Sequence, residues 1–238
     1  SFLQKKSIPL ESVMSKVWNK KIFKHIQTSV DQSSKKLAEE RGSCPDAEEY
    51  GFKERFSNKT AIAPTASISI ICGGASPGVE PVAANSYAHK TLSGSYNVRN
   101  KYLQGILKKY SKDDEEIWST ITTNQGSVSH LDFLTDHEKD VFKTAFELDQ
   151  KWIIELGAER TPYVSQAQSI NIFLPADVYK KELHQIHFLA WKKGLKSLYY
   201  CRSKSIQRAE NINNGPSRNL LENEIKKSSD SDECLSCQ

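Results

Sequence analysis

Residues 168–201 read QSINIFLPADVYKKELHQIHFLAWKKGLKSLYYC, and this pattern predicts the fold class. The Ile-Asn-Ile alternation and the β-branched content predict a strand over residues 168–173. A helix is predicted over residues 176–193, with Gly194 directly after it, and a second strand over residues 195–201. A strand, a helix and a further strand in this order form a crossover unit. The chain is therefore predicted to have an α/β fold with parallel neighbouring strands.

A long amphipathic helix is predicted from Leu10 to Arg41, with Gly42 as the stop signal just beyond it. Apolar residues recur in this segment at mostly three- to four-residue spacing, so we expect them to face the core. They are Val13, Val17, Ile22, Ile26, Val30 and Leu37.

Another helix is predicted to begin at a capping box, in which the Thr135 hydroxyl and the Glu138 carboxylate satisfy each other's unpaired amides. We expect this helix to reach Leu156 and to end at Gly157. The residues predicted to form its buried side are Val141, Phe142, Ala145, Phe146, Trp152 and Ile153.

Composition excludes several classes of protein. With 238 residues, 37% of them hydrophobic, the chain can bury one sizeable core. Its 33 basic and 29 acidic residues are spread along the chain, which gives little support to direct nucleic-acid binding. There is no apolar run of about 18 residues that could span a membrane, and no secretion signal. Five scattered cysteines then favour a reducing, cytoplasmic location.

The composition changes near residue 205, where Asn, Ser, Lys, Asp and Glu replace the apolar residues. We therefore expect one folded section over residues 1–204 and a flexible tail over residues 205–238.

The segment Ala61-Ile-Ala-Pro-Thr-Ala-Ser-Ile-Ser69 predicts a turn at which a helix begins. Backbone amides at the start of a helix have no partner within it, and with nearby hydroxyl groups they suit a phosphate. A capped helix that binds nothing explains the same pattern.

Tyr199 and Tyr200 stand side by side at the end of the second predicted strand. Aromatic residues commonly fill strands, so a packing role is one interpretation. Radical transfer is the other, because a phenol can lose an electron and a proton together. Successive side chains of a regular strand point to opposite faces, so contact between the two rings requires a bend or a strand end.

The C-terminal residues include Cys234 and Cys237 in a Cys-X-X-Cys arrangement. Such a pair can form a disulfide and exchange it with other thiols. Half of a zinc site and two unused thiols are the alternatives, although the chain offers no second ligand pair for zinc.

Taken together, these motifs resemble those of the class I ribonucleotide reductase large subunit, in its eukaryotic and phage forms. The resemblance extends from about Ile22 to Cys237 and includes Gly78-Val-Glu-Pro81 after the phosphate segment. It implies a fold that is the C-terminal portion of a ten-stranded α/β barrel, with outer helices and a flexible redox tail. The residues that would line the substrate's diphosphate are Thr65, Ala66, Ser67, Ile68 and Ser69.

The resemblance also assigns roles to the two other motifs. Tyr199 would be the radical-relay phenol nearer the active-site thiol, and Tyr200 the one nearer the small subunit. Cys234 and Cys237 would form the redox tail that thioredoxin or glutaredoxin reduces. Three further cysteines, Cys44, Cys72 and Cys201, receive no role.

The implied activity is reduction of ribonucleoside diphosphates to deoxyribonucleotides for DNA synthesis. The family's thiyl-forming cysteine and its regulatory nucleotide sites have no counterpart in these 238 residues. The chain would therefore act only with an N-terminal part of the large subunit, as a split gene product or as a fragment. It would bind no metal or cofactor itself, because the di-iron centre and tyrosyl radical are expected in the small subunit.

The resemblance places the docking groove for the small subunit's C-terminal tail between the two helices predicted over residues 135–156 and 176–193. Its candidate residues are Phe146, Trp152, Leu183 and Ile186. A different class of function is a non-catalytic module that binds redox partners through its Cys-X-X-Cys tail. An independent thiol oxidoreductase is disfavoured, because its cysteine pair would normally start a helix.

Overall fold

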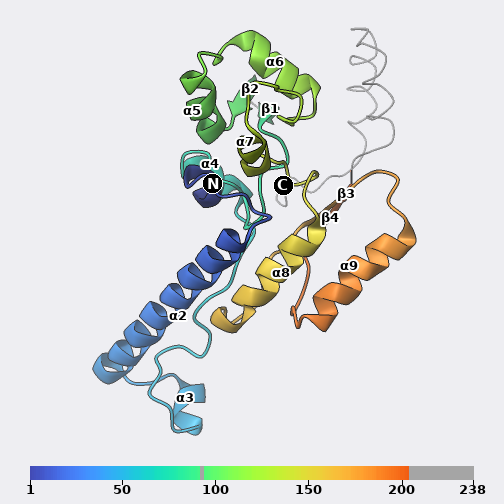
Figure 1. Ribbon diagram of the computed structural model, residues 1–238. Helices are drawn as coiled ribbons and strands as arrows, with labels where there is room; N and C mark the ends of the chain where they lie inside the picture. Colours follow the sequence, from blue (N-terminus) through green and yellow to red (C-terminus); the bar gives the residue numbers. More distant parts are fainter. Residues whose placement is uncertain (92–93, 204–238) are drawn as a thin grey trace.

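The computed structural model describes residues 1–91 and 94–203 (Figure 1). The segment predicted as a tail, residues 205–238, lies outside the described residues. In Figure 1 the long helix α2 (Val13–Arg41) and helix α9 (Lys180–Lys192) lie on either side of α8 (Gln150–Arg160). Helices α5 (Lys101–Lys109) and α6 (Glu115–Thr123) form a separate group above them.

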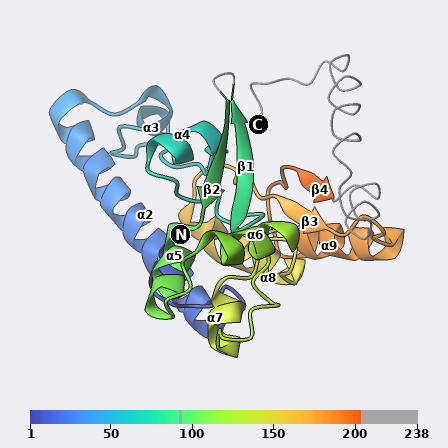
Figure 2. The same ribbon diagram turned by 90° about the horizontal axis from the view of Figure 1, so that it is seen from above.

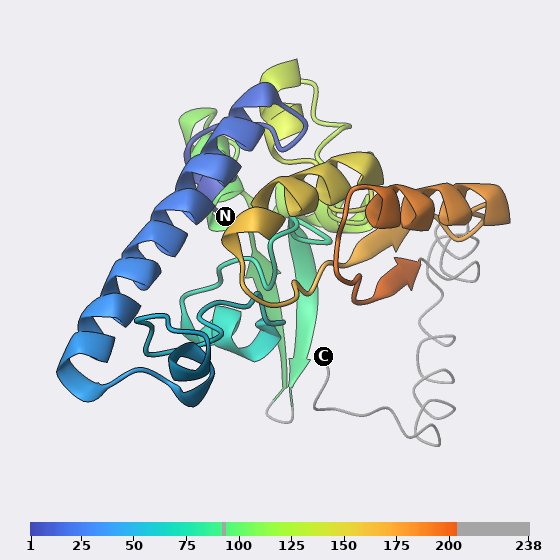
Figure 3. The ribbon, with the colours of Figure 1, turned by 90° about the horizontal axis from the view of Figure 1, so that it is seen from below.

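The predicted crossover unit is present. Strand β3 (Ile172–Leu174) pairs in parallel with β4 (Cys201–Ser203), and α9 connects them. Figure 3 shows the two strands side by side beneath α9. The unit packs on α8 through one apolar cluster. Its buried members are Ile153, Ile154, Ile170, Ile172, Leu174, Ile186 and Ala190.

Both strands are shorter than predicted, and the second one is displaced. Residues 195–200 are not assigned to a strand, so β4 starts at Cys201, the last residue of the predicted strand. Gly194, at φ +77°, turns the chain out of α9, and Leu195 and Leu198 then pack against the cluster beneath it. The apolar residues that suggested a strand, Leu195 and Leu198, are thus core-packing residues in an irregular segment.

Helix α2 confirms the predicted helix, but the predicted buried side is partly wrong. Val13, Val17 and Ile26 are 73%, 50% and 41% exposed. The helix is attached to α8 mainly by polar contacts: Lys16 pairs with Glu155, and Asn19 Nδ2 donates to the Leu156 carbonyl over 2.9 Å. The other three predicted residues, Ile22, Val30 and Leu37, are half-buried, so the described part of the chain covers the apolar side only in part.

The helix predicted over residues 135–156 is two helices. The capping box at Thr135 is confirmed, but the helix that it starts, α7 (Asp136–Val141), is only six residues long, and α8 begins at Gln150. Between them the Ala145 amide donates to the Val82 carbonyl over 3.0 Å, outside any helix. Gly157 does not end α8 but lies within it, where an added Cβ would come within 2.7 Å of Ile170 Cδ1.

Sequence patterns did not predict the antiparallel hairpin of β1 (Ser86–Thr91) and β2 (Gly94–Arg99), which stands apart from β3 and β4 in Figure 2. Beside it, α5, α6, α7 and the loops between them form a second apolar cluster, whose buried members are Leu103, Leu107, Trp118, Ile121, Val128, Leu131, Leu134, Val141 and Phe142. Within residues 1–91 and 94–203 the strands form two two-stranded sheets and close no barrel. No helix among those residues is both long and apolar enough to cross a membrane. The short helices are α1 (Phe2–Lys5), α3 (Pro45–Glu49), α4 (Ala66–Ile71) and the 3-10 turn η1 (Thr161–Tyr163).

Candidate functional site

The two adjacent tyrosines are in contact. Their ring centroids lie 4.2 Å apart with an interplanar angle of 58°, and the side chains are 43% (Tyr199) and 36% (Tyr200) exposed. The pair immediately precedes β4, where the backbone is not yet a regular strand. This is the strand-end geometry that ring contact requires. The Arg202 guanidinium lies 5.3 Å from the centre of the Tyr200 ring, so a cation also faces the pair.

Backbone hydrogen bonds attach this pair to the segment that leads into β3. The Tyr199 amide donates to the Ile170 carbonyl, and the Ile172 amide donates to the Tyr200 carbonyl, both over 2.8 Å. Ile170 and Ile172 are at most 1% exposed. The partly exposed phenols are therefore held on a rigid, buried strand segment.

Asn171 lies between these two isoleucines and makes two further contacts. Its side-chain Nδ2 donates to Glu80 Oε1, and its Oδ1 accepts from the Tyr200 amide over 3.3 Å. Glu80 is only 5% exposed. Burial raises the pKa of the Glu80 carboxyl, while the hydrogen bond from the Asn171 side chain opposes that shift.

A buried arginine lies close enough to Glu80 for their charges to interact. Arg160 is 4% exposed, and its Nε donates to Gln168 Oε1 over 2.6 Å. Burial lowers the pKa of its guanidinium to about 10, against the attraction of Glu80 and Glu159. Sequence reasoning missed this polar group, although an Asn within an apolar strand and a Glu within Gly-Val-Glu-Pro were visible signals.

The candidate phosphate segment forms the N-terminal end of α4, whose first residue is Ala66. Thr65 is the N-cap residue, but its side chain makes no capping hydrogen bond: its amide and hydroxyl both donate to the Pro77 carbonyl, over 3.2 and 2.8 Å. Ser67 and Ile68 are exposed. The amides of Ala66, Ser67 and Ile68 belong to the first turn, where a helix offers them no acceptor.

Ser69 is oriented differently from the rest of that segment. Its amide donates to the Thr65 carbonyl over 2.8 Å, and its hydroxyl donates to the Ala66 carbonyl over 2.6 Å. The side chain is 8% exposed. Both of its donors are therefore used inside α4, and the open donors of the segment are those of the three preceding residues.

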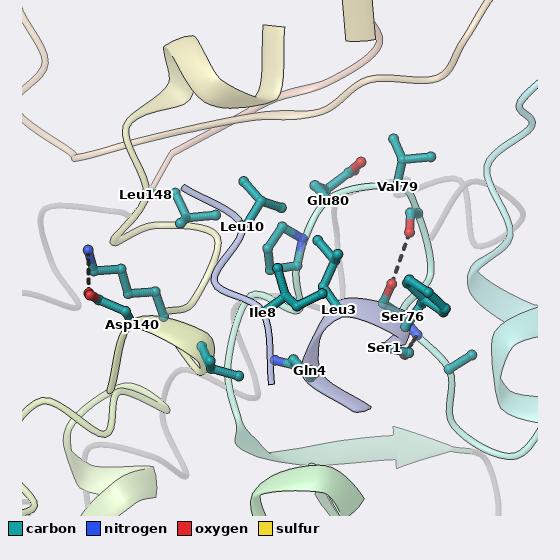
Figure 4. A pocket seen from close by; sticks show the side chains of 16 residues that line it. Ser1, Leu3, Gln4, Ile8, Leu10, Ser76, Val79, Glu80, Asp140 and Leu148 are labelled. Carbon is teal, nitrogen blue, oxygen red and sulfur yellow. Dashed lines mark hydrogen bonds and ion pairs between the residues drawn. The ribbon is translucent and has the colours of Figure 1, made fainter. Parts of the chain in front are cut away.

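A cavity of about 260 Å³ lies between the N-terminal segment and the Gly78–Pro81 segment (Figure 4). Leu3, Ile8 and Leu10 line it, and the Glu80 carboxylate points away from Leu3 and Ile8. The cavity is mainly apolar and does not open onto the tyrosine pair. Its walls therefore pack the N-terminal segment against this loop, and Glu80 is a residue that the cavity shares with the site.

The cysteines fall into two groups. Cys234 and Cys237, the predicted redox pair, lie outside the described residues. Cys44 is half-buried, and Cys72 and Cys201 are exposed, all as free thiols. In the described part of the chain, His, Cys, Asp and Glu form no group that could hold a metal ion.

The four candidate groove residues differ in exposure. Ile186 is 5% exposed and belongs to the core beneath α9, so it cannot line an open groove. Leu183 is half-buried at the edge of the same cluster. Trp152 lies beneath the Lys16 ammonium, 4.7 Å from the ring centre, and Phe146 packs edge-on against Phe173.

Comparisons with known proteins bear on this arrangement. The family model described as "Ribonucleotide reductase, barrel domain" matches residues 46–201. The ribonucleoside-diphosphate reductase large subunit of Invertebrate iridescent virus 6 is 48% identical over 216 residues, which cover 89% of this chain and 22% of the viral protein. Large chain 2 of Saccharomyces cerevisiae is 31% identical, over 85% of this chain and 27% of the yeast protein.

A solved structure is also similar. The Actinobacillus ureae class Id ribonucleotide reductase alpha subunit matches with a TM-score of 0.79 and 37% identity, covering 89% of this chain and 38% of its own. The present chain thus spans only about a fifth to two fifths of the length of these relatives. Because the family model matches more than half of the chain, and the relatives share both sequence and fold, the chain belongs to the ribonucleotide reductase family and contains part of its barrel domain.

Proposed function

We propose that this chain is the C-terminal part of a ribonucleoside-diphosphate reductase large subunit. In this proposal it contributes the radical-relay tyrosines and the diphosphate loop to an enzyme that reduces ribonucleotides to deoxyribonucleotides. The observation that carries the proposal is the contact between Tyr199 and Tyr200, 4.2 Å between ring centroids. Catalysis then requires the N-terminal part of the large subunit and the small subunit.

The chemistry assigned to the tyrosines is transfer of an electron together with a proton. Oxidised Tyr200 takes a hydrogen atom from the Tyr199 phenol, and oxidised Tyr199 takes one from a thiol in the N-terminal part. Each phenol is restored by the reverse step, so neither is consumed. The small subunit, with its expected di-iron centre and tyrosyl radical, would supply the oxidising equivalent. The Arg202 guanidinium lies over the Tyr200 ring, and the attraction between cation and ring helps to hold the ring in place.

The first turn of α4 is proposed to hold the substrate's diphosphate. Three amides, those of Ala66, Ser67 and Ile68, lie at the positive end of a short helix. An anion there gains hydrogen bonds that the helix itself cannot provide. Ser67 adds an exposed hydroxyl beside them.

Replacement of Ser67 by Glu tests the phosphate site. The added carboxylate suits the start of a helix, so α4 should keep its stability, but it repels the diphosphate. We expect KM for the ribonucleoside diphosphate to rise about tenfold or more, which corresponds to about 1.4 kcal/mol. Steady-state kinetics of the assembled enzyme measures this. Asn58→Glu, which adds the same charge at an exposed position outside the loop, should leave KM unchanged. An unaltered KM in Ser67→Glu would remove the loop from substrate binding.

The surface formed by α8 and α9 is proposed to receive the tail of the small subunit. Leu183, half-buried on α9, can anchor a peptide, and Ile186 supports the surface from beneath. Trp152 lies on the side of α8 that faces α2, under the Lys16 ammonium and against the Leu10 cluster, so it is not part of this surface. Anchoring side chains of this kind often contribute most of the affinity of an interface.

Alanine substitution tests this docking surface. We expect Leu183→Ala to weaken small-subunit binding about tenfold or more, measured by titration of the assembled large subunit. Phe52→Ala, which removes an apolar side chain that is 65% exposed beyond α3, is the matched control and should bind normally. Unchanged affinity in Leu183→Ala would place docking elsewhere.

A further inference from the structure

The Tyr200 amide donates to a side chain, whereas the backbone hydrogen bonds of this segment use the Tyr199 amide and the Tyr200 carbonyl. Asn171 Oδ1 accepts from that amide over 3.3 Å, while Asn171 Nδ2 donates to Glu80. An amide side chain can do both at once, because it carries an acceptor and two donors. Asn171 therefore bridges Glu80, 91 positions before it in the sequence, and Tyr200, 29 positions after it.

The Glu80 end of this bridge is fixed by its surroundings. Glu80 is 5% exposed, and a Cβ added to Gly78 would lie 2.9 Å from Glu80 Oε1. The absent side chain of Gly78 thus leaves the space that the carboxylate occupies. Ser76 Oγ donates to the Gly78 carbonyl over 2.9 Å, which closes the turn before Glu80.

The same turn is attached to the candidate phosphate loop. Thr65 donates twice to the Pro77 carbonyl, through its amide and its hydroxyl. A short path then leads from the start of α4 through residues 77–80 to Asn171 and the Tyr200 amide. Contiguous hydrogen bonds of this kind can carry positional restraint between sites.

The tyrosines need such a restraint more than most strand residues do. Backbone hydrogen bonds join the pair to the segment from Ile170 to Ile172, but the two tyrosines are 43% and 36% exposed, so core packing alone does not fix the rings. A displacement of about 1 Å at a reacting group can reduce a rate about a hundredfold. A contact that holds the Tyr200 backbone therefore affects the transfer step directly.

We propose that Asn171, supported by Glu80, is a positioning residue for the tyrosine pair. It ties the Tyr200 backbone to the turn that follows the candidate phosphate loop, and it sets the geometry in which the two phenols exchange a hydrogen atom. This inference rests on the proposed function. Asn171 touches no reacting atom, and its effect passes through Tyr200.

The test compares three variants in the enzyme assembled from both parts of the large subunit and the small subunit. Asn171→Leu keeps the size of the side chain but removes both hydrogen bonds, so kcat should fall about tenfold or more while KM for the ribonucleoside diphosphate stays within about twofold. Asn171→Ser, whose hydroxyl is too short to span both partners, should behave in the same way and serves if the Leu variant fails to fold.

The third variant combines Asn171→Asp with Glu80→Gln. The Gln amide now donates to the Asp carboxylate, which still accepts from the Tyr200 amide, so the bridge is rebuilt with donor and acceptor exchanged. We expect kcat of this double variant to return to within about threefold of the parent enzyme. A purely structural role for Asn171 would not predict this recovery.

Asn85→Leu is the matched control. Asn85 is 1% exposed and donates to the Gly126 and Phe142 carbonyls in the other cluster, so its loss destabilises the fold without touching the tyrosines. Its kcat should be normal in the folded enzyme. The inference is overturned if Asn171→Leu and Asn171→Ser keep normal kcat, if KM rises instead, or if the double variant is as slow as Asn171→Leu. If Tyr199→Phe and Tyr200→Phe also retain turnover, the proposed function itself has failed.

Discussion

Replacing Tyr199 or Tyr200 by Phe is expected to reduce turnover of the assembled enzyme about a thousandfold or more. Phenylalanine keeps the ring, and with it the packing at 4.2 Å, but it has no phenolic O–H to surrender. A relay with one member missing cannot pass a hydrogen atom onward. Substrate binding should be intact, because neither ring belongs to the phosphate loop.

Two measurements are needed for this prediction: the rate of deoxyribonucleotide formation and the affinity for the ribonucleoside diphosphate. Tyr179→Phe is the control, since Tyr179 is 80% exposed at the start of α9 and makes no capping hydrogen bond. It should turn over normally. Normal turnover in both Tyr199→Phe and Tyr200→Phe would end the relay assignment, whereas loss of substrate affinity would point to a structural defect.

Replacing Cys234 and Cys237 together by Ser is expected to abolish continuous turnover with thioredoxin or glutaredoxin. Serine cannot form or exchange a disulfide, so the oxidised active site would not be reduced again. The reducing equivalents already present should still support a single round. Product measured against enzyme should then stop at about one equivalent per active site.

A small dithiol offers a way to separate this effect from misfolding. If it reaches the active site directly, it should restore turnover in the double Ser variant. Cys72→Ser is the matched control, because Cys72 is an exposed free thiol at the end of α4. Continued turnover of the double Ser variant with thioredoxin would show that the tail is not the shuttle.

Sequence patterns predicted the crossover unit because its apolar residues pack on one another within a single short stretch of the chain. Ile170, Ile172 and Ile186 all enter a single cluster, so periodicity and burial agree there. They disagree on α2, whose exposed Val13 and Val17 would need a covering element from outside the described residues. Periodicity reports which side of a helix is apolar, but not whether anything packs on it.

The break between α7 and α8 could not be predicted from the sequence, because it depends on long-range contacts. Phe142 and Ala145 continue the helical spacing, and both are buried, but they belong to loop backbone held by contacts such as the Ala145 amide with the Val82 carbonyl. Val82 is 63 positions away in the sequence. A distant acceptor of this kind decides where a helix ends, and local propensity does not reveal it.

The candidate site also contains a part that the sequence predicted and a part that it did not. The tyrosine pair could be predicted, because Tyr199 and Tyr200 are adjacent and only their ring contact needed the structure. The bridge from Asn171 to Glu80 could not, because residues so far apart are brought together by packing alone. The redox role of Cys234 and Cys237 remains a prediction from their spacing and from the family resemblance.

The most direct test of the account is a structure of this chain assembled with the N-terminal part of the large subunit and the small subunit. The quantities to measure are the distance from the Tyr199 ring to the nearest cysteine sulfur of the N-terminal part and the distance from the Tyr200 ring to the small subunit. If the tyrosine pair is the radical relay, we expect a thiol in contact with Tyr199 and a Tyr200 ring that faces the docked small subunit. A tyrosine pair enclosed by other side chains, with neither a thiol nor the small subunit beside it, would contradict it.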